Sequence, residues 1–251
     1  MAEYKTLYES ILRRFREYFL PNGIPEEEYP LTRKIAVGIP PRYPKSHGRT
    51  QTALVLLLHF GLCKEEDRPR IAKMLTDMID EKGFMETGFI GTYYLPHVLT
   101  ACGRTDLAYP LLLREESPSW LYSVVHGATT VWEHWNSLKE DGSFWSTDMN
   151  SFNHYAYGAV FDWIFAAAVG IAPTEDAPGY EHIVIAPHPH KALGFVDAGI
   201  KTARGDVHMK WYYKGDTVYY EITVPKGTTA TLTLPSGHTE ALSGGAYLFS
   251  E

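Results

Sequence analysis

Residues 152–173 read FNHYAYGAVFDWIFAAAVGIAP and mark the boundary between two kinds of sequence. Small and apolar residues recur there at intervals of three and four, which is the spacing of a helix with one buried face. The residues at that spacing are Ala156, Ala159, Val160, Trp163, Ile164 and Ala167. We therefore expect a helix over residues 152–169, ended by Gly170 because glycine favours the left-handed conformation that closes many helices.

Helical spacing also dominates the chain upstream of this segment. The predicted helices are residues 4–19, 51–62, 67–81, 93–102 and 106–114. Residues 21–46 are rich in proline, glycine and charge, and they predict a long loop. Helices paired in this way indicate an array of helical hairpins, either a toroid or a solenoid. Because no fixed-period repeat is visible, a regular solenoid is disfavoured.

Downstream of residue 172 the spacing changes to the alternation that is typical of strands. Residues 207–213 and 217–224 flank Lys214-Gly215-Asp216 and predict a β-hairpin. Further strands are predicted at residues 182–186 and 229–234. The expected fold is mainly α with a β domain. We expect residues 1–172 to form the helical domain, residues 173–251 an antiparallel β-sandwich, and residues 174–180 the linker.

The composition disfavours several classes of protein. The net charge is −7 and no cluster of Lys and Arg stands out, so we expect no binding of nucleic acid. Charged residues interrupt every apolar stretch near the N-terminus and no long apolar run follows, so we expect neither a signal peptide nor a membrane helix. A cytoplasmic protein, or a part of a longer chain, fits these features. We expect Cys63 and Cys102 to be buried free thiols, and we expect no metal or other cofactor.

The segment 117–136 has no clear helical or strand period, and it contains three tryptophans, two histidines and a carboxylate. Glu133 lies between Trp132 and Trp135, and the protonation of a carboxylate in such a place is set by its surroundings. This makes Glu133 a candidate catalytic group. The alternative is that Glu133 is a surface acid beside core tryptophans, since charged residues are mostly exposed.

A second cluster lies at residues 147–155, at the start of the helix predicted there. Asp148 and Asn150 are residue types that cap helices, and we favour that role for them. His154 follows within the first turn, where the positive end of the helix dipole disfavours a charged imidazole. A neutral His154 can bond to a sugar hydroxyl or position a water, although a purely structural role is the alternative. A third segment, residues 86–94, has two glycines around a short loop that either holds a ligand or turns the chain.

Three motifs, in this order, closely resemble motifs of the bacterial α-L-rhamnosidases, a family of glycoside hydrolases. They are residues 87–92 (TGFIGT), 127–135 (GATTVWEHW) and 150–156 (NSFNHYA). Smaller matches occur at residues 51–53, 103–108 and 118–120. The order of all six makes the resemblance specific, and it extends from about residue 45 to residue 235.

The resemblance implies that the helices form part of an (α/α)6 barrel, followed by the β-sandwich. It also implies hydrolysis of terminal α-L-rhamnose with inversion, in which an acid protonates the leaving oxygen and a carboxylate base activates water. The two groups lie about 6.5–9.5 Å apart in such enzymes. Glu133 is the implied base and His154 the implied sugar-binding histidine. Trp120, Trp132 and Trp135 are the implied aromatic walls of the pocket.

The chain departs from the family at the general acid. The family's acid lies upstream in an Asp-Glu-Arg-x-Gly-Trp segment, which does not occur in residues 1–251. Because an acid or base typically contributes about 10²–10⁴-fold to the rate, we expect weak or no activity from this chain alone. Glu86, Asp141 and Asp148 are candidate replacement acids, although structural roles are favoured for all three. Apolar faces left by missing helices predict self-association or association with an upstream barrel half.

Three functions remain open at this point. The first is the part of an inverting α-L-rhamnosidase that supplies the base and binds a rhamnose-containing carbohydrate. The second is a non-catalytic carbohydrate-binding or interaction fragment, in which Glu133 and His154 are residual. The third is an (α/α)-barrel glycosidase with another sugar specificity.

Overall fold

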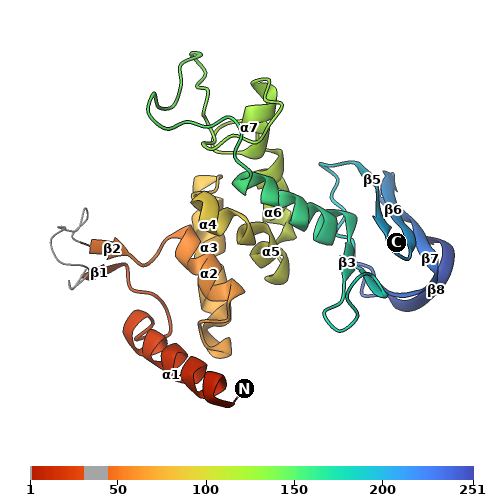
Figure 1. The fold of residues 1–251 in the computed structure, drawn as a ribbon, viewed down its shortest axis with the longest axis horizontal. Helices are drawn as coiled ribbons and strands as arrows, with labels where there is room; N and C mark the ends of the chain where they lie inside the picture. Colours follow the sequence, from red (N-terminus) through yellow and green to blue (C-terminus); the bar gives the residue numbers. More distant parts are fainter. Residues whose placement is uncertain (1, 31–44) are drawn as a thin grey trace. The chain divides into compact units, whose positions relative to one another are not determined.

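The computed structural model describes residues 2–30 and 45–251. They form two compact units, one ending at Tyr157 and one beginning at Gly158. The first unit is helical and the second is built around a sheet (Figure 1), which confirms the expected fold class. The domain boundary expected after residue 172 stays a prediction.

The first unit contains seven helices among the described residues, and the spacing of apolar residues predicts all of them except α4 and α7. They are α1 (Ala2–Phe19), α2 (Gln51–His59), α3 (Arg68–Lys82), α4 (Gly88–Thr92), α5 (Tyr94–Ala101), α6 (Thr105–Leu113) and α7 (Trp120–Val125), with a 3-10 turn, η1 (Glu65–Asp67), before α3. Helix α7 was not predicted, because its six residues are too short to show a period.

Helix α2 is the centre of this unit, and it packs against α3, α4 and α5. The side chain of Thr50 caps α2 by accepting the Ala53 N–H. Fully buried aliphatic side chains fill the contacts between these helices, and they include Leu54, Leu58, Ile71, Leu75, Leu95 and Leu99. Burial of this kind stabilises the unit far more than helix propensity does.

The segment predicted as a long loop contains a short pair of antiparallel strands, β1 (Glu28–Pro30) and β2 (Lys45–His47). The remainder of that prediction, residues 31–44, lies outside the described residues. Helix α1 is joined to the end of α2 by Arg16, whose guanidinium donates to the carbonyls of Leu62 and Cys63 at 2.8 and 2.9 Å.

The predicted helix over residues 152–169 begins four residues later than expected. It consists of a 3-10 turn η2 (Ala156–Ala159), a short α8 (Val160–Trp163) and a π-helical turn η3 (Ile164–Val169). Residues 151–154 do not join it, because their backbone bonds to residues 131–133 instead. Gly170 ends the segment with a φ of 81°, as predicted.

The second unit contains a six-stranded sheet. Its strands are β3 (Ile171–Pro173), β4 (His182–Ile185), β5 (Phe195–Thr202), β6 (Gly205–Lys214), β7 (Thr217–Thr233) and β8 (Thr239–Ser250). The predicted hairpin is confirmed as β6 and β7, with Lys214 opposite Thr217. All pairs are antiparallel except β4 with β7, so the expectation of a purely antiparallel domain is wrong at that pair. Residues 174–180 connect β3 to β4 within this sheet.

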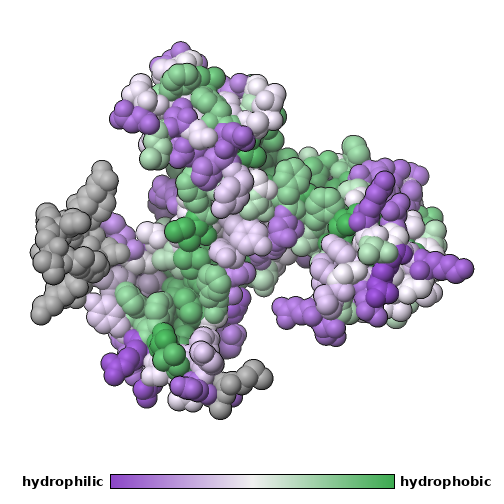
Figure 2. Space-filling model, viewed as in Figure 1, coloured by the Kyte–Doolittle hydropathy of each residue, from purple (hydrophilic) through white to green (hydrophobic). Residues whose placement is uncertain are grey.

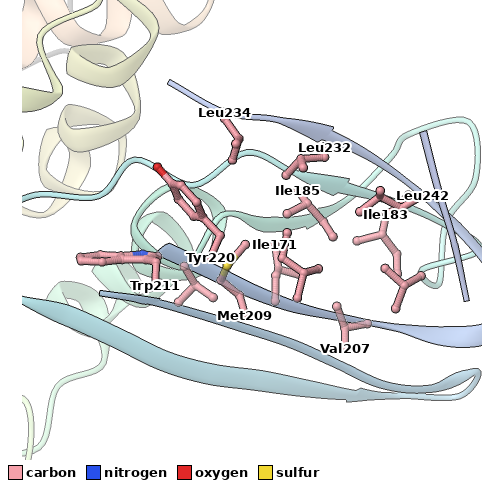
Figure 3. Close-up of a cluster of buried hydrophobic side chains, with 14 of the residues drawn as sticks. Ile171, Ile183, Ile185, Val207, Met209, Trp211, Tyr220, Leu232, Leu234 and Leu242 are labelled. Carbon is pink, nitrogen blue, oxygen red and sulfur yellow. The ribbon is translucent and has the colours of Figure 1, made fainter. Parts of the chain in front are cut away.

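Strand β7 gives the sheet its two layers. An irregularity between Val224 and Thr229 divides β7 into a half that pairs with β6 and a half that pairs with β4. Side chains of β6 and the first half of β7 meet those of β4 and the second half of β7 in one core (Figure 3). Met209, Trp211 and Tyr220 come from the first pair of strands, and Ile183 and Leu232 come from the second. A sheet that curls on itself in this way buries its inner face as a sandwich does.

Large apolar side chains are exposed along α1 (Figure 2), among them Leu7 and Ile11. In the part of the chain that the structure describes, no helix is long and apolar enough to cross a bilayer. Both cysteines are free; Cys63 is buried and Cys102 half-buried, and burial raises the pKa of each thiol.

Candidate active site

Glu133 and His154 lie on two paired backbone segments. The Glu133 N–H donates to the Ser151 carbonyl at 2.9 Å, and the His154 N–H donates to the Val131 carbonyl at 2.8 Å. The hydroxyl of Thr130 adds a bond to the Phe152 carbonyl. These bonds hold residues 130–133 and 151–154 together as an irregular pair, and they bring together two of the three motifs that carry the chemistry.

The carboxylate of Glu133 is fixed by the same neighbour as its backbone. Its Oε2 accepts the Ser151 N–H at 2.7 Å, and the side chain is half-buried. Within residues 2–30 and 45–251, no donor contacts the other oxygen, Oε1. A carboxylate held by one oxygen with the second oxygen open can accept a proton from a bound water.

The ring of His154 is held from two directions. It stacks on Phe89 with centroids 4.7 Å apart and planes 10° from parallel. Its Nδ1 accepts the Ala156 N–H at 3.3 Å, so the neutral ring carries its proton on Nε2. The helical segment begins at Ala156, so His154 precedes its first turn, and the expectation that His154 lies within that turn is wrong. The Nε2–H is available as a donor to a hydroxyl.

Two of the three implied wall residues form one aromatic cluster. Trp135 stacks on Tyr157 with centroids 3.6 Å apart, and Trp120 lies edge-on to Trp135 at 5.4 Å. The indole N–H of Trp120 donates to the Tyr157 carbonyl at 2.8 Å. Phe89 joins this cluster to His154, since its ring also contacts Tyr157 at 4.9 Å.

Trp132 lies apart from that cluster. It is only 6% exposed and packs edge-on against Phe152 at 5.2 Å. In this structure Trp132 supports the loop that carries Glu133 rather than presenting a face to solvent. Phe89 and Tyr157 were not singled out from the sequence, although the loop containing Phe89 was; their ring contacts form only after distant segments pack together.

Two of the three candidate replacement acids, Glu86 and Asp141, have structural side-chain contacts, whereas Asp148 contacts its neighbour through its backbone. Glu86 is ion-paired with Lys82, and the Asp148 N–H bonds to the Ser146 hydroxyl. Asp141 accepts from the hydroxyl and the N–H of Ser143 at 2.6 and 2.9 Å, and these bonds lower its pKa. A general acid must hold a proton at neutral pH, whereas the surroundings of Asp141 favour the deprotonated carboxylate.

The side chains of this region do not form a metal centre. Across residues 2–30 and 45–251, no group of three His, Cys, Asp or Glu side chains is arranged to hold a metal.

Comparison with known proteins now gives the class of protein. Residues 1–168 match the model of the bacterial α-L-rhamnosidase six-hairpin glycosidase domain, and residues 170–248 match the C-terminal domain of the same family. The chain therefore belongs to the bacterial α-L-rhamnosidase family, a family of glycoside hydrolases.

Individual relatives agree with this assignment. An α-L-rhamnosidase of Formosa agariphila is 38% identical over 242 residues, which is 96% of this chain and 24% of that protein. One from Streptomyces avermitilis is 40% identical over 195 residues, which is 77% of this chain and 19% of that protein. The chain thus spans a fifth to a quarter of the length of these relatives.

Solved structures are similar over the whole chain. The S. avermitilis enzyme in complex with L-rhamnose is 31% identical with a TM-score of 0.84, over 100% of this chain and 24% of that chain. The native enzyme of Aspergillus terreus is 30% identical with a TM-score of 0.85, over 99% of this chain and 27% of that chain.

Proposed function

We propose that this chain is the part of an inverting α-L-rhamnosidase that supplies the general base, Glu133. In the reaction, Glu133 Oε1 accepts a proton from water, and the oxygen of that water attacks the anomeric carbon of a terminal α-L-rhamnose. An acid on the other face of the sugar donates a proton to the leaving oxygen. The product is L-rhamnose with inverted configuration.

One observation carries the assignment of the base. The carboxylate of Glu133 is anchored through Oε2 while Oε1 has no donor among the described residues. His154 lies on the segment paired with that of Glu133 and offers its Nε2–H to a sugar hydroxyl. Trp135 and Trp120 supply aromatic surface beside them, against which the C–H face of a sugar packs. We assign Trp132 a supporting role on the basis of its burial.

The proposal assigns the general acid to a part of the family's barrel outside residues 1–251. Of the three acids considered within the chain, Glu86 and Asp141 have structural side-chain contacts and Asp148 is exposed. General acid catalysis alone is typically worth about 10²–10⁴-fold. We therefore expect little hydrolysis by this chain alone and much more when the rest of a barrel is supplied.

The test uses residues 1–251 alone and in a chimera. In the chimera they replace the structurally matching part of the S. avermitilis enzyme, and hydrolysis of a chromogenic α-L-rhamnoside is measured. We expect the chimera to be active and Glu133→Gln to lower its kcat by about 10³-fold. Glu140→Gln is the matched control, because it makes the same change at an exposed glutamate in the following loop. Proton NMR of the first product formed reports whether the configuration is inverted.

Each outcome decides between the candidate functions. Equal activity of the Glu133→Gln and Glu140→Gln chimeras would show that Glu133 is not the base. Activity of residues 1–251 alone, lost in Glu133→Gln, would place an acid within this chain. An inactive chimera that still binds L-rhamnose would favour a binding fragment, and a preference for another glycoside would favour a different specificity.

A further inference from the structure

The outer face of the sheet carries a row of aromatic side chains that the site around Glu133 does not use. Phe195 on β5 pairs in register with Tyr212 on β6, and Tyr212 pairs with Tyr219 on β7. The neighbours of these residues along the strands, such as Trp211 and Tyr220, are buried in the core. Because side chains alternate along a strand, the three rings lie on the opposite face.

The aromatic row has an exposed ring at one end and two nearly parallel rings beside it. Phe195 is 63% exposed, so its ring is open to contact from solvent. The rings of Tyr212 and Tyr219 lie 5.6 Å apart with planes 11° from parallel. Three neighbouring strands make the row about 10 Å long, given the usual spacing between strands.

A second row, of charged side chains, runs beside the aromatic row. Asp197, Lys210 and Glu221 pair in register across the same three strands, so acceptors and a donor alternate. The ammonium of Lys214 lies 5.4 and 5.1 Å from the ring centroids of Tyr212 and Tyr219. Two lysines and two carboxylates leave this surface with no net charge.

We propose that these two rows, which we call the sheet-face site, bind a neutral glycan chain lying across β5, β6 and β7. The C–H faces of successive sugars pack on the rings of Phe195, Tyr212 and Tyr219. Sugar hydroxyls donate to Asp197 and Glu221 and accept from Lys210. The site does not include Glu133, and it goes beyond hydrolysis because it holds a polymeric glycan without acting on it.

The chemistry of the surface favours this ligand over others. A nucleic acid needs an excess of positive charge, which the balanced row does not provide. An acidic glycan would meet Asp197 and Glu221 as like charges. A stable protein partner buries roughly 800 Å² per side, more than one row of three rings offers. A neutral sugar uses both the apolar rings and the paired donors and acceptors.

The test is affinity electrophoresis of residues 1–251 in native gels that contain a neutral rhamnose-bearing polysaccharide. Parallel gels contain a uronate-bearing polysaccharide or none. We expect retardation in the neutral gel, and we expect Phe195→Ala to weaken the apparent affinity about five- to tenfold, the usual value of an aromatic contact. Tyr219→Phe should retain binding because it keeps the ring.

Two controls separate this site from the others. Phe161→Ala removes a phenylalanine of matched exposure, 62%, and should leave retardation unchanged. His154→Ala should also leave it unchanged, which distinguishes this site from sugar binding in the candidate active site whatever the fate of the proposed hydrolysis. The proposal is overturned by no retardation in the neutral gel, by retardation only in the uronate gel, or by equal effects of Phe161→Ala and Phe195→Ala.

Discussion

Tyr157 lies at the centre of the aromatic residues beside the candidate active site. Its ring stacks on Trp135 and contacts Phe89, and its carbonyl accepts the Trp120 indole N–H. Burial raises the pKa of its phenol to about 12. One buried ring thus connects the segment containing Glu133 to the loop that holds His154, and a change of its charge would disturb both.

The raised pKa of Tyr157 predicts a loss of stability in alkali. Below the unfolded-state pKa of about 10 both states keep the proton, so the stabilisation is fully present. Between pH 10 and about 12 the unfolded chain releases its proton first, and stability falls as pH rises. Between pH 9 and 12, we expect the free energy of unfolding of Tyr157→Phe to fall by about 2 kcal/mol less than that of the unchanged chain. Urea unfolding across this pH range measures the difference. The same pH slope in both proteins would contradict the assignment.

Glu133 and His154 are candidate site residues that the sequence suggests, but the sequence does not predict their surroundings. Glu133 and His154 stand within motifs whose residue types suggest chemistry directly. The bond from Ser151 to Glu133, and the stacking of Phe89 on His154, depend on how segments far apart in the sequence pack. The tryptophans show the same limit, since composition cannot distinguish buried Trp132 from Trp135 in the cluster.

At the scale of elements, Arg16 joins α1 to the end of α2. Its guanidinium donates to three carbonyls, those of Gly61, Leu62 and Cys63. Lysine cannot reproduce this fork, because its ammonium is a single point of charge. We expect Arg16→Lys to lower the free energy of unfolding by about 1–2 kcal/mol, measured by urea denaturation. Arg14→Lys is the control at an exposed position on the same helix, and it should change the free energy of unfolding by less than about 0.5 kcal/mol. Equal effects of the two variants would show that the three hydrogen bonds of Arg16 are not stabilising.

At Gly170, which ends the helical segment before β3, both the backbone angle and the surrounding backbone atoms exclude a side chain. It has a φ of 81°, and a Cβ there would lie 2.3 Å from the backbone nitrogen of Pro187. Gly179 has a similar φ of 76°, but a Cβ there would have no other atom within 4 Å. We expect Gly179→Ala to cost only the strain of a left-handed residue, about 1–2 kcal/mol. Gly170→Ala should cost at least about 3 kcal/mol, because the backbone must also move. Equal melting temperatures for the two variants would contradict the close approach.

Elements whose apolar residues recur at a clear spacing were predictable from sequence. Features fixed by hydrogen bonds to distant segments were not. The spacing of apolar residues predicts α1, α2, α3, α5 and α6 to within a few residues. It fails at residues 152–155, where hydrogen bonds to residues 131–133 compete with the helix. The parallel pairing of β4 with β7 was also missed, because alternation predicts a strand but not the direction of its neighbour.

At the scale of the whole molecule, the first unit exposes an apolar surface that its own helices do not cover. The family's barrel is built of six hairpins, and the chain spans a fifth to a quarter of the length of its relatives. Leu7 and Ile11 lie one turn apart on α1 and are 56% and 59% exposed. Contiguous apolar surface of this kind favours association, because burying it removes it from water at roughly 25 cal/mol per Å².

We therefore expect residues 1–251 to self-associate through α1. Size-exclusion chromatography with light scattering should show a mass that rises with protein concentration. Leu7→Lys together with Ile11→Lys should shift this rise to about tenfold higher concentration, since each change removes an apolar contact and adds a repelling charge. Leu248→Lys is the control, because it changes a side chain of similar exposure, 67%, on β8. A chain that stays monomeric throughout would show that the exposed face of α1 does not drive association, and an equal effect of Leu248→Lys would show that added charge alone accounts for the change.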